Sequence, residues 1–128
     1  MIDRAYIIDD DEISIFLTSA LLEAENFACH IECYQFASLA LDKLITISDK
    51  LLPQVIFLDL NMPVLNGWDF LNTLTMQEKR FLGKCRIFIL TSSIDAQEKE
   101  LARRYKLVSG FLQKPIDETE ISRIKQII

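Results

Sequence analysis

The chain has 128 residues and a net charge of −5; half of the residues are hydrophobic and 26% are charged. This length suits one domain with a core of its own, so we expect a single domain over residues 1–128. The acidic balance argues against direct binding of nucleic acid or of an anionic membrane. No apolar run reaches the length of a membrane span and the first residues lack the layout of a signal peptide, so a cytoplasmic protein is expected.

Five short apolar segments along the chain have the composition of β-strands. They are "RAYIID", "CHIECYQF", "QVIFLD", "CRIFILT" and "GFLQK", residues 4–9, 29–36, 54–59, 85–91 and 110–114. The third is apolar at successive positions, as a central parallel strand covered on both faces should be. Polar residues interrupt the second, which is therefore expected nearer the edge of a sheet.

A helical pattern follows each of these segments. In the first helix the apolar residues recur at the spacing of an amphipathic stripe, namely Ile13, Phe16, Leu17, Ala20, Leu21 and Ala24. Asp11, Asp95 and Asp117 stand where N-caps of the first, fourth and last helices are expected. Residues 75–86, "TMQEKRFLGKCR", are interpreted as an ordinary solvated connection.

The three cysteines are odd in number and lack the CxxC spacing of a metal site. Cys29 and Cys33 flank His30, which is a weak indication of metal binding. We interpret these two cysteines and Cys85 as small hydrophobic residues in the core of a reduced cytosolic protein.

Five strand-then-helix units in sequence predict an α/β fold with a parallel sheet and helices on both faces. Sheets of this kind bind ligands beyond the carboxyl ends of their strands. The expected strands end in Asp9 and Asp10, in Asp59, in Thr91 and in Lys114. Carboxylates that meet at one edge repel each other unless a hard cation joins them, and Mg²⁺ prefers such oxygen ligands. With a hydroxyl and an ammonium group beside the metal, one carboxylate could attack phosphorus.

These motifs resemble those of a response-regulator receiver domain, the CheY-like phosphorylatable module of two-component signalling. The resemblance extends from "YIIDDDE" through "IFLDLNMPVLNGWDF" and "ILTSS" to "FLQKP", in that order. It implies a (βα)5 doubly wound, flavodoxin-like fold with a five-stranded parallel sheet in the order 2-1-3-4-5.

The resemblance also implies roles for the acidic residues. Asp59 matches the phosphoacceptor, which takes a phosphoryl group from the phosphohistidine of a histidine kinase. Asp10 matches a direct Mg²⁺ ligand, and Asp9 matches an acid that reaches the metal mainly through water. Asn61 would contribute its backbone carbonyl to the metal.

Four further positions match the switch machinery of the family. Thr91 matches the hydroxyl that binds the phosphoryl group and moves on activation, and Lys114 matches the lysine that pairs with the phosphoryl oxygens. Pro115 fits a cis bond after that lysine. Phe111 stands at the switch aromatic position, three residues before the lysine.

The implied function is Mg²⁺-dependent phosphoryl transfer to Asp59 with slow autodephosphorylation, in a signalling module rather than an enzyme. The phosphoryl donor would be a sensor histidine kinase or a phosphotransfer protein. The output surface would comprise the fourth helix, fifth strand and fifth helix, in a monomer or a phosphorylation-dependent dimer with an unnamed output partner. The last expected helix reaches the end of the chain, so we expect either a stand-alone receiver or a domain taken from a longer protein.

Two other classes of protein share part of this pattern. A phosphatase of the haloacid-dehalogenase type also uses a strand-end aspartate, but it needs an acid two residues later, where this chain has Asn61. A flavodoxin or dinucleotide binder needs a phosphate-cradling loop after the first strand, and carboxylates at that place would repel an anion.

Overall fold

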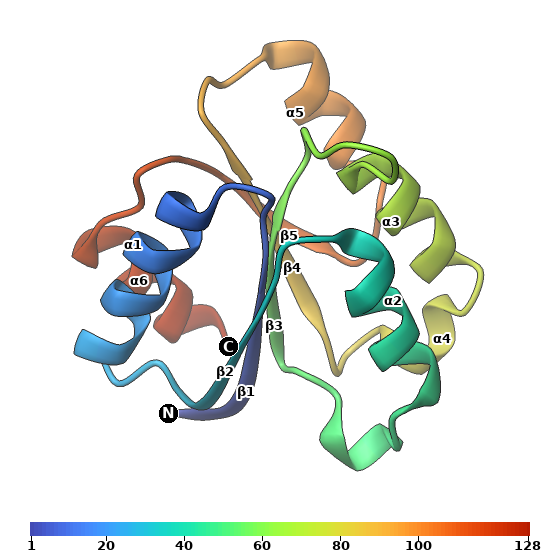
Figure 1. The fold of residues 1–128 in the computed structure, drawn as a ribbon, viewed down its shortest axis with the longest axis horizontal. Coiled ribbons are helices and arrows are strands. Elements are labelled where there is room, and N and C mark those ends of the chain that lie inside the picture. Colours follow the sequence, from blue (N-terminus) through green and yellow to red (C-terminus); the bar gives the residue numbers. More distant parts are fainter.

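The computed structural model describes residues 1–128, in which strands and helices alternate along the chain (Figure 1). The strands are β1 (Ile2–Ile8), β2 (Ala28–Tyr34), β3 (Val55–Asp59), β4 (Arg86–Thr91) and β5 (Val108–Gln113). The helices are α1 (Glu12–Ala24), α2 (Ala37–Thr46), α3 (Gly67–Thr75), α4 (Glu78–Phe81), α5 (Ala96–Ala102) and α6 (Glu118–Ile127), with a 3-10 turn at Asp49–Leu51. All five expected strands are present. None of the helices is both long and apolar enough to cross a bilayer.

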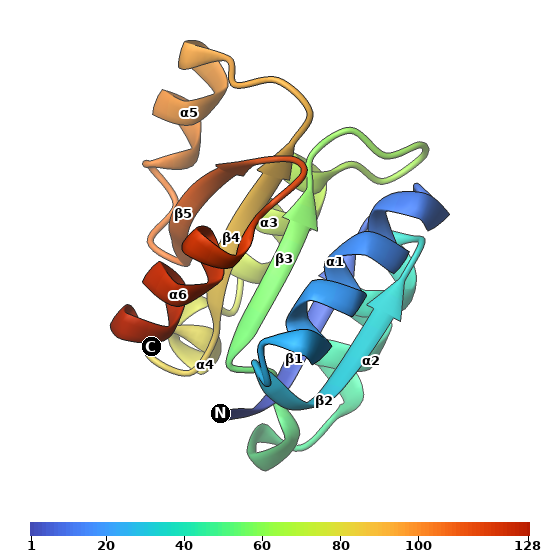
Figure 2. The same ribbon diagram turned by 90° about the vertical axis from the view of Figure 1, so that its left-hand side faces the viewer.

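The five strands form one parallel sheet in the order β2-β1-β3-β4-β5, which confirms the predicted fold class and strand order. The strands of a parallel sheet point the same way, so their carboxyl ends share one edge (Figure 2). The strand order reverses between β1 and β3, which is where ligands bind in open sheets of this kind.

Helices cover both faces of the sheet: α1 and α6 lie on one side and the remaining helices on the other (Figures 1 and 2). Strand β3 is buried throughout because it contributes to both cores. Ile56 and Leu58 belong to the core under α2 and α3, whereas Val55 and Phe57 belong to the core under α1 and α6. This confirms the central position expected for "QVIFLD".

Acidic side chains cap the helices as expected. Asp11, Asp95 and Asp117 each accept a hydrogen bond from a backbone N–H in the first turn of the helix that follows, at 2.8–2.9 Å. Such caps satisfy N–H groups that have no partner inside the helix, and each stabilises the helix by about 1 kcal/mol.

Helix α1 does not bury the stripe that its sequence pattern indicates. Ile13 and Phe16 are each 70% exposed, and Leu17 is 54% exposed. The buried residues of α1 are Thr18 and Leu22. An amphipathic helix would turn this stripe toward the sheet, so the expectation was wrong for these three residues, and also for Ala20 and Ala24, which are exposed. Ile13, Phe16 and Leu17 form an apolar face beside the carboxyl edge of the sheet.

The interpretation of residues 75–86 as an ordinary solvated connection was also wrong. This stretch contains the short helix α4, and Phe81 within it is buried in the larger core. Arg80 donates hydrogen bonds to the carbonyl oxygens of Leu44 (2.5 Å) and Ile47 (2.6 Å) and pairs with Asp49 at 2.8 Å. Arg80 therefore caps the C-terminal end of α2 from a distant part of the chain.

The cysteines differ in their surroundings. Cys85 is buried, which raises the pKa of its thiol to about 12, and it is a core residue as expected. Cys29 and Cys33 are exposed on the edge strand β2, so the core interpretation was wrong for these two. Strand β2 is the edge of the sheet, with a strand on one side only, so its residues are less completely covered than those of the central strands. None of the three forms a disulfide.

Candidate functional site

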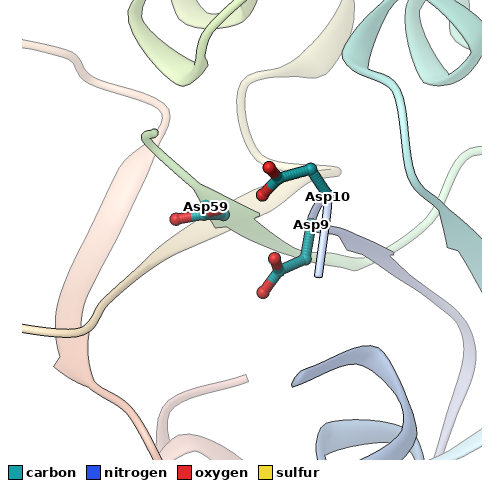
Figure 3. A group of neighbouring side chains, drawn as sticks. All are labelled: Asp9, Asp10 and Asp59. Carbon is teal, nitrogen blue, oxygen red and sulfur yellow. The ribbon is translucent and has the colours of Figure 1, made fainter. Parts of the chain in front are cut away.

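Three carboxylates meet where β1 and β3 end (Figure 3). Asp9 and Asp10 follow β1, and Asp59 is the last residue of β3. One oxygen from each lies within 4.8 Å of the others, which is a spacing that one divalent cation can bridge. Asp9 and Asp59 are buried, whereas Asp10 is exposed. The predicted acidic residues are therefore together at the predicted edge, and no comparable group of His, Cys, Asp or Glu includes Cys29, His30 and Cys33.

Asp9 is fully buried and all of its partners are donors. Its Oδ1 accepts the backbone N–H of Asp11 at 3.0 Å. Its Oδ2 accepts the hydroxyl of Ser14 at 2.6 Å and the ammonium group of Lys114 at 2.6 Å. A buried carboxylate needs such donors to replace the water that it loses.

Lys114 links the carboxylates from the end of β5. Its Nζ lies 2.6 Å from Asp9 Oδ2 and 3.7 Å from Asp59 Oδ1, and its side chain is 17% exposed. The backbone N–H of Lys114 donates to the carbonyl of Thr91 at 2.7 Å, which attaches the loop after β5 to the end of β4. The Lys114–Pro115 bond is cis, as expected.

Asp59 has the most perturbed acidity in the site. The pKa of this carboxyl is raised to about 7, mainly by burial; the Asp9 carboxylate also raises it, and the ammonium group of Lys114 acts in the opposite direction. The backbone N–H of Asn61 also approaches Asp59 Oδ1, at 3.4 Å. Burial disfavours the ionised form of a carboxyl group. A cation that binds beside the carboxylate stabilises that form.

The hydroxyl of Thr91 is buried but faces its own loop. Thr91 Oγ1 donates to the carbonyl of Ser93 at 2.8 Å and accepts the N–H of Ser93 at 3.3 Å. Phe111, on β5, is partly buried and packs against the larger core. The two predicted switch residues thus lie on the neighbouring strands β4 and β5, with Phe111 opposite Ile89 in the register.

The loop after Asp59 has a strained turn and a tight contact. Val64 has a positive φ of 67°, which is rare for a β-branched residue, and the N–H of Leu65 bonds to the carbonyl of Pro63 at 2.8 Å across it. A Cβ on Gly67 would lie 2.7 Å from the carbonyl oxygen of Asp59. Glycine therefore allows α3 to begin directly against the backbone of the phosphoacceptor candidate.

Sequence reasoning missed Ser14. The signal was available in principle, because Ser14 lies in the first turn of α1 and helical side chains lean toward the N-terminus of their helix. A hydroxyl at that place points back toward the end of β1, where Asp9 lies. Ser14 also lines a pocket of about 280 Å³ with Leu17, Lys114 and Ile116, between α1 and the loop after β5.

Comparison with known proteins assigns the family. The model of the response regulator receiver domain matches residues 5–125, and the chain belongs to this family. In this family the domain is a signalling module and not an enzyme with a separate substrate. The assignment disfavours both the phosphatase and the dinucleotide-binding alternatives.

Individual relatives agree with this assignment. The chain is similar to a two-component response regulator from Cytophaga hutchinsonii, with a TM-score of 0.92, 24% identity and coverage of 98% of this chain and 96% of that chain. It is also similar to the chemotaxis protein CheY4 of Vibrio cholerae, with a TM-score of 0.81, 23% identity and full coverage of both chains. At these identities the likeness concerns the fold.

One curated relative is much longer than this chain. Hybrid signal transduction histidine kinase C of Dictyostelium discoideum is 32% identical over 79 residues, which are 62% of this chain and 6% of that protein.

Proposed function

We propose that this chain accepts a phosphoryl group on Asp59 from a phosphohistidine, in a cytoplasmic two-component relay. The observation that carries the proposal is the position of Asp59, a buried carboxylate of raised pKa with Lys114 and two further aspartates beside it. Each neighbour has a use in phosphoryl transfer, because the lysine attracts phosphoryl oxygens and the carboxylates can hold a cation.

In the proposed step, a carboxylate oxygen of Asp59 attacks the phosphorus of the donor. A P–O bond forms as the P–N bond to the donor imidazole breaks, and the electron pair returns to the ring nitrogen. Lys114 is already 3.7 Å from Asp59 Oδ1, so its ammonium group needs only a small movement to reach a phosphoryl oxygen. The acyl phosphate is then hydrolysed slowly by water.

The acidic residues fit Mg²⁺, because oxygens from three separate side chains lie within 4.8 Å of one another and Mg²⁺ takes oxygen ligands, several of them water. Asp9, Asp10, Asp59 and the backbone carbonyl of Asn61 would hold it. When bound, Mg²⁺ neutralises charge on the phosphoryl oxygens.

The phosphoacceptor is tested with a small-molecule phosphodonor, Mg²⁺ and intact-protein mass spectrometry. Wild type should gain one phosphoryl group and Asp59→Asn none, because the amide has no nucleophilic oxyanion. Asp42→Asn, at an exposed acid on α2, should behave as wild type. The adduct should be labile to hydroxylamine, and a hydroxylamine-stable ester on Thr91 or Ser92 would contradict the assignment.

Metal binding is tested by thermal melting. Mg²⁺ in the millimolar range should raise the melting temperature of wild type, because the folded chain gathers the carboxylates and the unfolded chain does not. Asp10→Asn should show a smaller shift. If Mg²⁺ leaves the melting temperature of wild type unchanged, the metal assignment is wrong.

The proposed switch couples Thr91 to Phe111. The Thr91 hydroxyl would leave Ser93 for a phosphoryl oxygen on Asp59, and Phe111 would turn inward into the space vacated, altering the surface of α5, β5 and α6. One phosphoryl group can shift these states only if they lie within a few kcal/mol. With beryllofluoride as the phosphoryl mimic, amide shifts over residues 92–112 should be large in wild type and small in Thr91→Ala. Equal shifts in both would exclude this coupling.

The partner implied by the family is a histidine kinase or a phosphotransfer protein. The exposed apolar face of Ile13, Phe16 and Leu17 lies beside the site, where a donor protein must sit for its histidine to reach Asp59. Phe16→Ser should slow transfer from a phosphorylated kinase of the same genome and leave small-molecule phosphorylation unchanged. Phe36→Ser, at an exposed aromatic at the start of α2, is the matched control. Equal rates for the two variants would rule out docking on this face.

A further inference from the structure

One carboxylate oxygen at the site has two competing donors. Asp9 Oδ2 accepts both Ser14 Oγ and Lys114 Nζ at 2.6 Å, while Oδ1 is held by the N–H of Asp11. Asp9 is fully buried, so bulk water has poor access to replace a donor that leaves. The two donors differ in kind: Ser14 is fixed in the first turn of α1, and Lys114 carries a flexible charge on the loop after β5.

Lys114 is closer to Asp9 than to Asp59, at 2.6 Å against 3.7 Å. A phosphoryl group on Asp59 adds anionic oxygens near Lys114, and its ammonium group is drawn toward them. Moving there weakens its bond to Asp9 Oδ2. Without a second donor, this oxygen would be left buried and unsatisfied, and that cost would oppose the movement of the lysine.

We propose that Ser14 is a positioning residue that holds the Asp9 carboxylate while Lys114 moves from Asp9 to the phosphoryl group on Asp59. The proposal rests on the proposed function and extends it to a residue outside the family motifs. Ser14 has two effects: it satisfies Asp9 Oδ2 after the lysine leaves, and it keeps the carboxylate from rotating to follow the lysine. Both favour the phosphorylated arrangement.

The test compares Ser14→Ala and Ser14→Thr with wild type. Ser14→Ala should lower the phosphorylation rate with a small-molecule donor, and the affinity for beryllofluoride with Mg²⁺, by about tenfold or more, the effect of one hydrogen bond to a charged group. Ser14→Thr keeps the hydroxyl and should restore most of both. Ser19→Ala, which removes a hydroxyl from α1 further from the site, should match wild type.

A second measurement needs neither metal nor phosphodonor. In Mg²⁺-free Ser14→Ala the Asp9 carboxylate can turn, so the amide proton of Asp11, which bonds to Asp9 Oδ1, should exchange faster and shift in the NMR spectrum. The amide of Leu22 within α1 should not change. If both amides exchange faster, Ser14 only stabilises the helix and the positioning role is wrong.

The outcomes separate the two proposals. If wild type is not phosphorylated on Asp59, both the proposed function and the role of Ser14 are wrong. If wild type is phosphorylated, and Ser14→Ala has the same phosphorylation rate and the same affinity for beryllofluoride, only the role of Ser14 is wrong.

Discussion

Replacing Asp59 by asparagine should stabilise the protein in Mg²⁺-free solution above neutral pH. The folded state holds the Asp59 carboxylate in a buried place beside Asp9, and burial is the main reason that its pKa is raised to about 7. Asparagine is similar in size and carries no charge. The substitution therefore removes an ionised group that the fold disfavours.

The magnitude and its pH range follow from this pKa. In the folded state the pKa rises from 3.8 to about 7, so the folded protein binds a proton more tightly than the unfolded chain and stability falls as pH rises between these values. The full penalty, present above pH 7, is roughly 4 kcal/mol for a shift of this size. Since the Asp59 carboxylate is coupled to its neighbours, we expect Asp59→Asn to gain about 2–4 kcal/mol at pH 8 and less than half of that at pH 5.

Urea denaturation followed by circular dichroism measures this gain, with a chelator present and at both pH values. Asp42→Asn controls for the loss of one exposed surface charge and should change stability little. Saturating Mg²⁺ should narrow the difference between Asp59→Asn and wild type, because the cation relieves the wild-type carboxylates. An equal gain at pH 5 and pH 8, or no gain at pH 8, would refute the account of Asp59 as a destabilised carboxylate.

Three further substitutions test the supporting structure by urea denaturation. Val64→Gly should stabilise the protein by about 1 kcal/mol, because Val64 has a positive φ and is fully exposed, so strain is relieved and no packing is lost. Gly67→Ala should destabilise by about 2 kcal/mol or more, because the new Cβ meets backbone atoms at the end of β3. Arg80→Ala should destabilise by about 2 kcal/mol, because two carbonyls at the end of α2 lose their donor.

Each of these substitutions has an outcome that contradicts its reasoning. A loss of stability in Val64→Gly would mean that the positive φ is not strained. Gly83→Ala has a positive φ but open space around the new Cβ, so an equal loss there and in Gly67→Ala would remove the steric argument. Lys79→Ala, at an exposed neighbour, should be neutral, and a similar loss there would show that Arg80 acts through helix propensity alone.

The strands and the acidic edge could be predicted because their signals are local. Each strand is a short apolar run, and β3 is apolar at successive positions, as burial on both faces requires. Asp59 and Lys114 then lie at the same edge because parallel strands end together. The strand order came from family resemblance, since hydrophobic periodicity does not specify which strands are neighbours.

The orientation of α1 could not be read from its pattern. The helix is apolar on two sides, with Ile15 and Leu22 on one side and Phe16 and Leu17 on the other. Hydrophobic periodicity therefore indicates two apolar stripes, and only the packing against α6 and the sheet determines which of them is buried. The contacts of Arg80 were hidden for another reason. They join residues more than 30 positions apart. An arginine in a polar stretch is expected to be solvated, and only the fold shows that α2 lies beside it.

The bond between Lys114 and Asp9 joins residues 105 positions apart. Such a contact exists only after β1 and β5 have both been added to the sheet around β3, so the last strand to dock completes the reactive group. A nascent or partly unfolded chain exposes Asp59 without its lysine and without a gathered set of carboxylates. Such a chain would accept phosphoryl groups from a kinase slowly. In the proposed relay, only folded copies of the protein would then be phosphorylated.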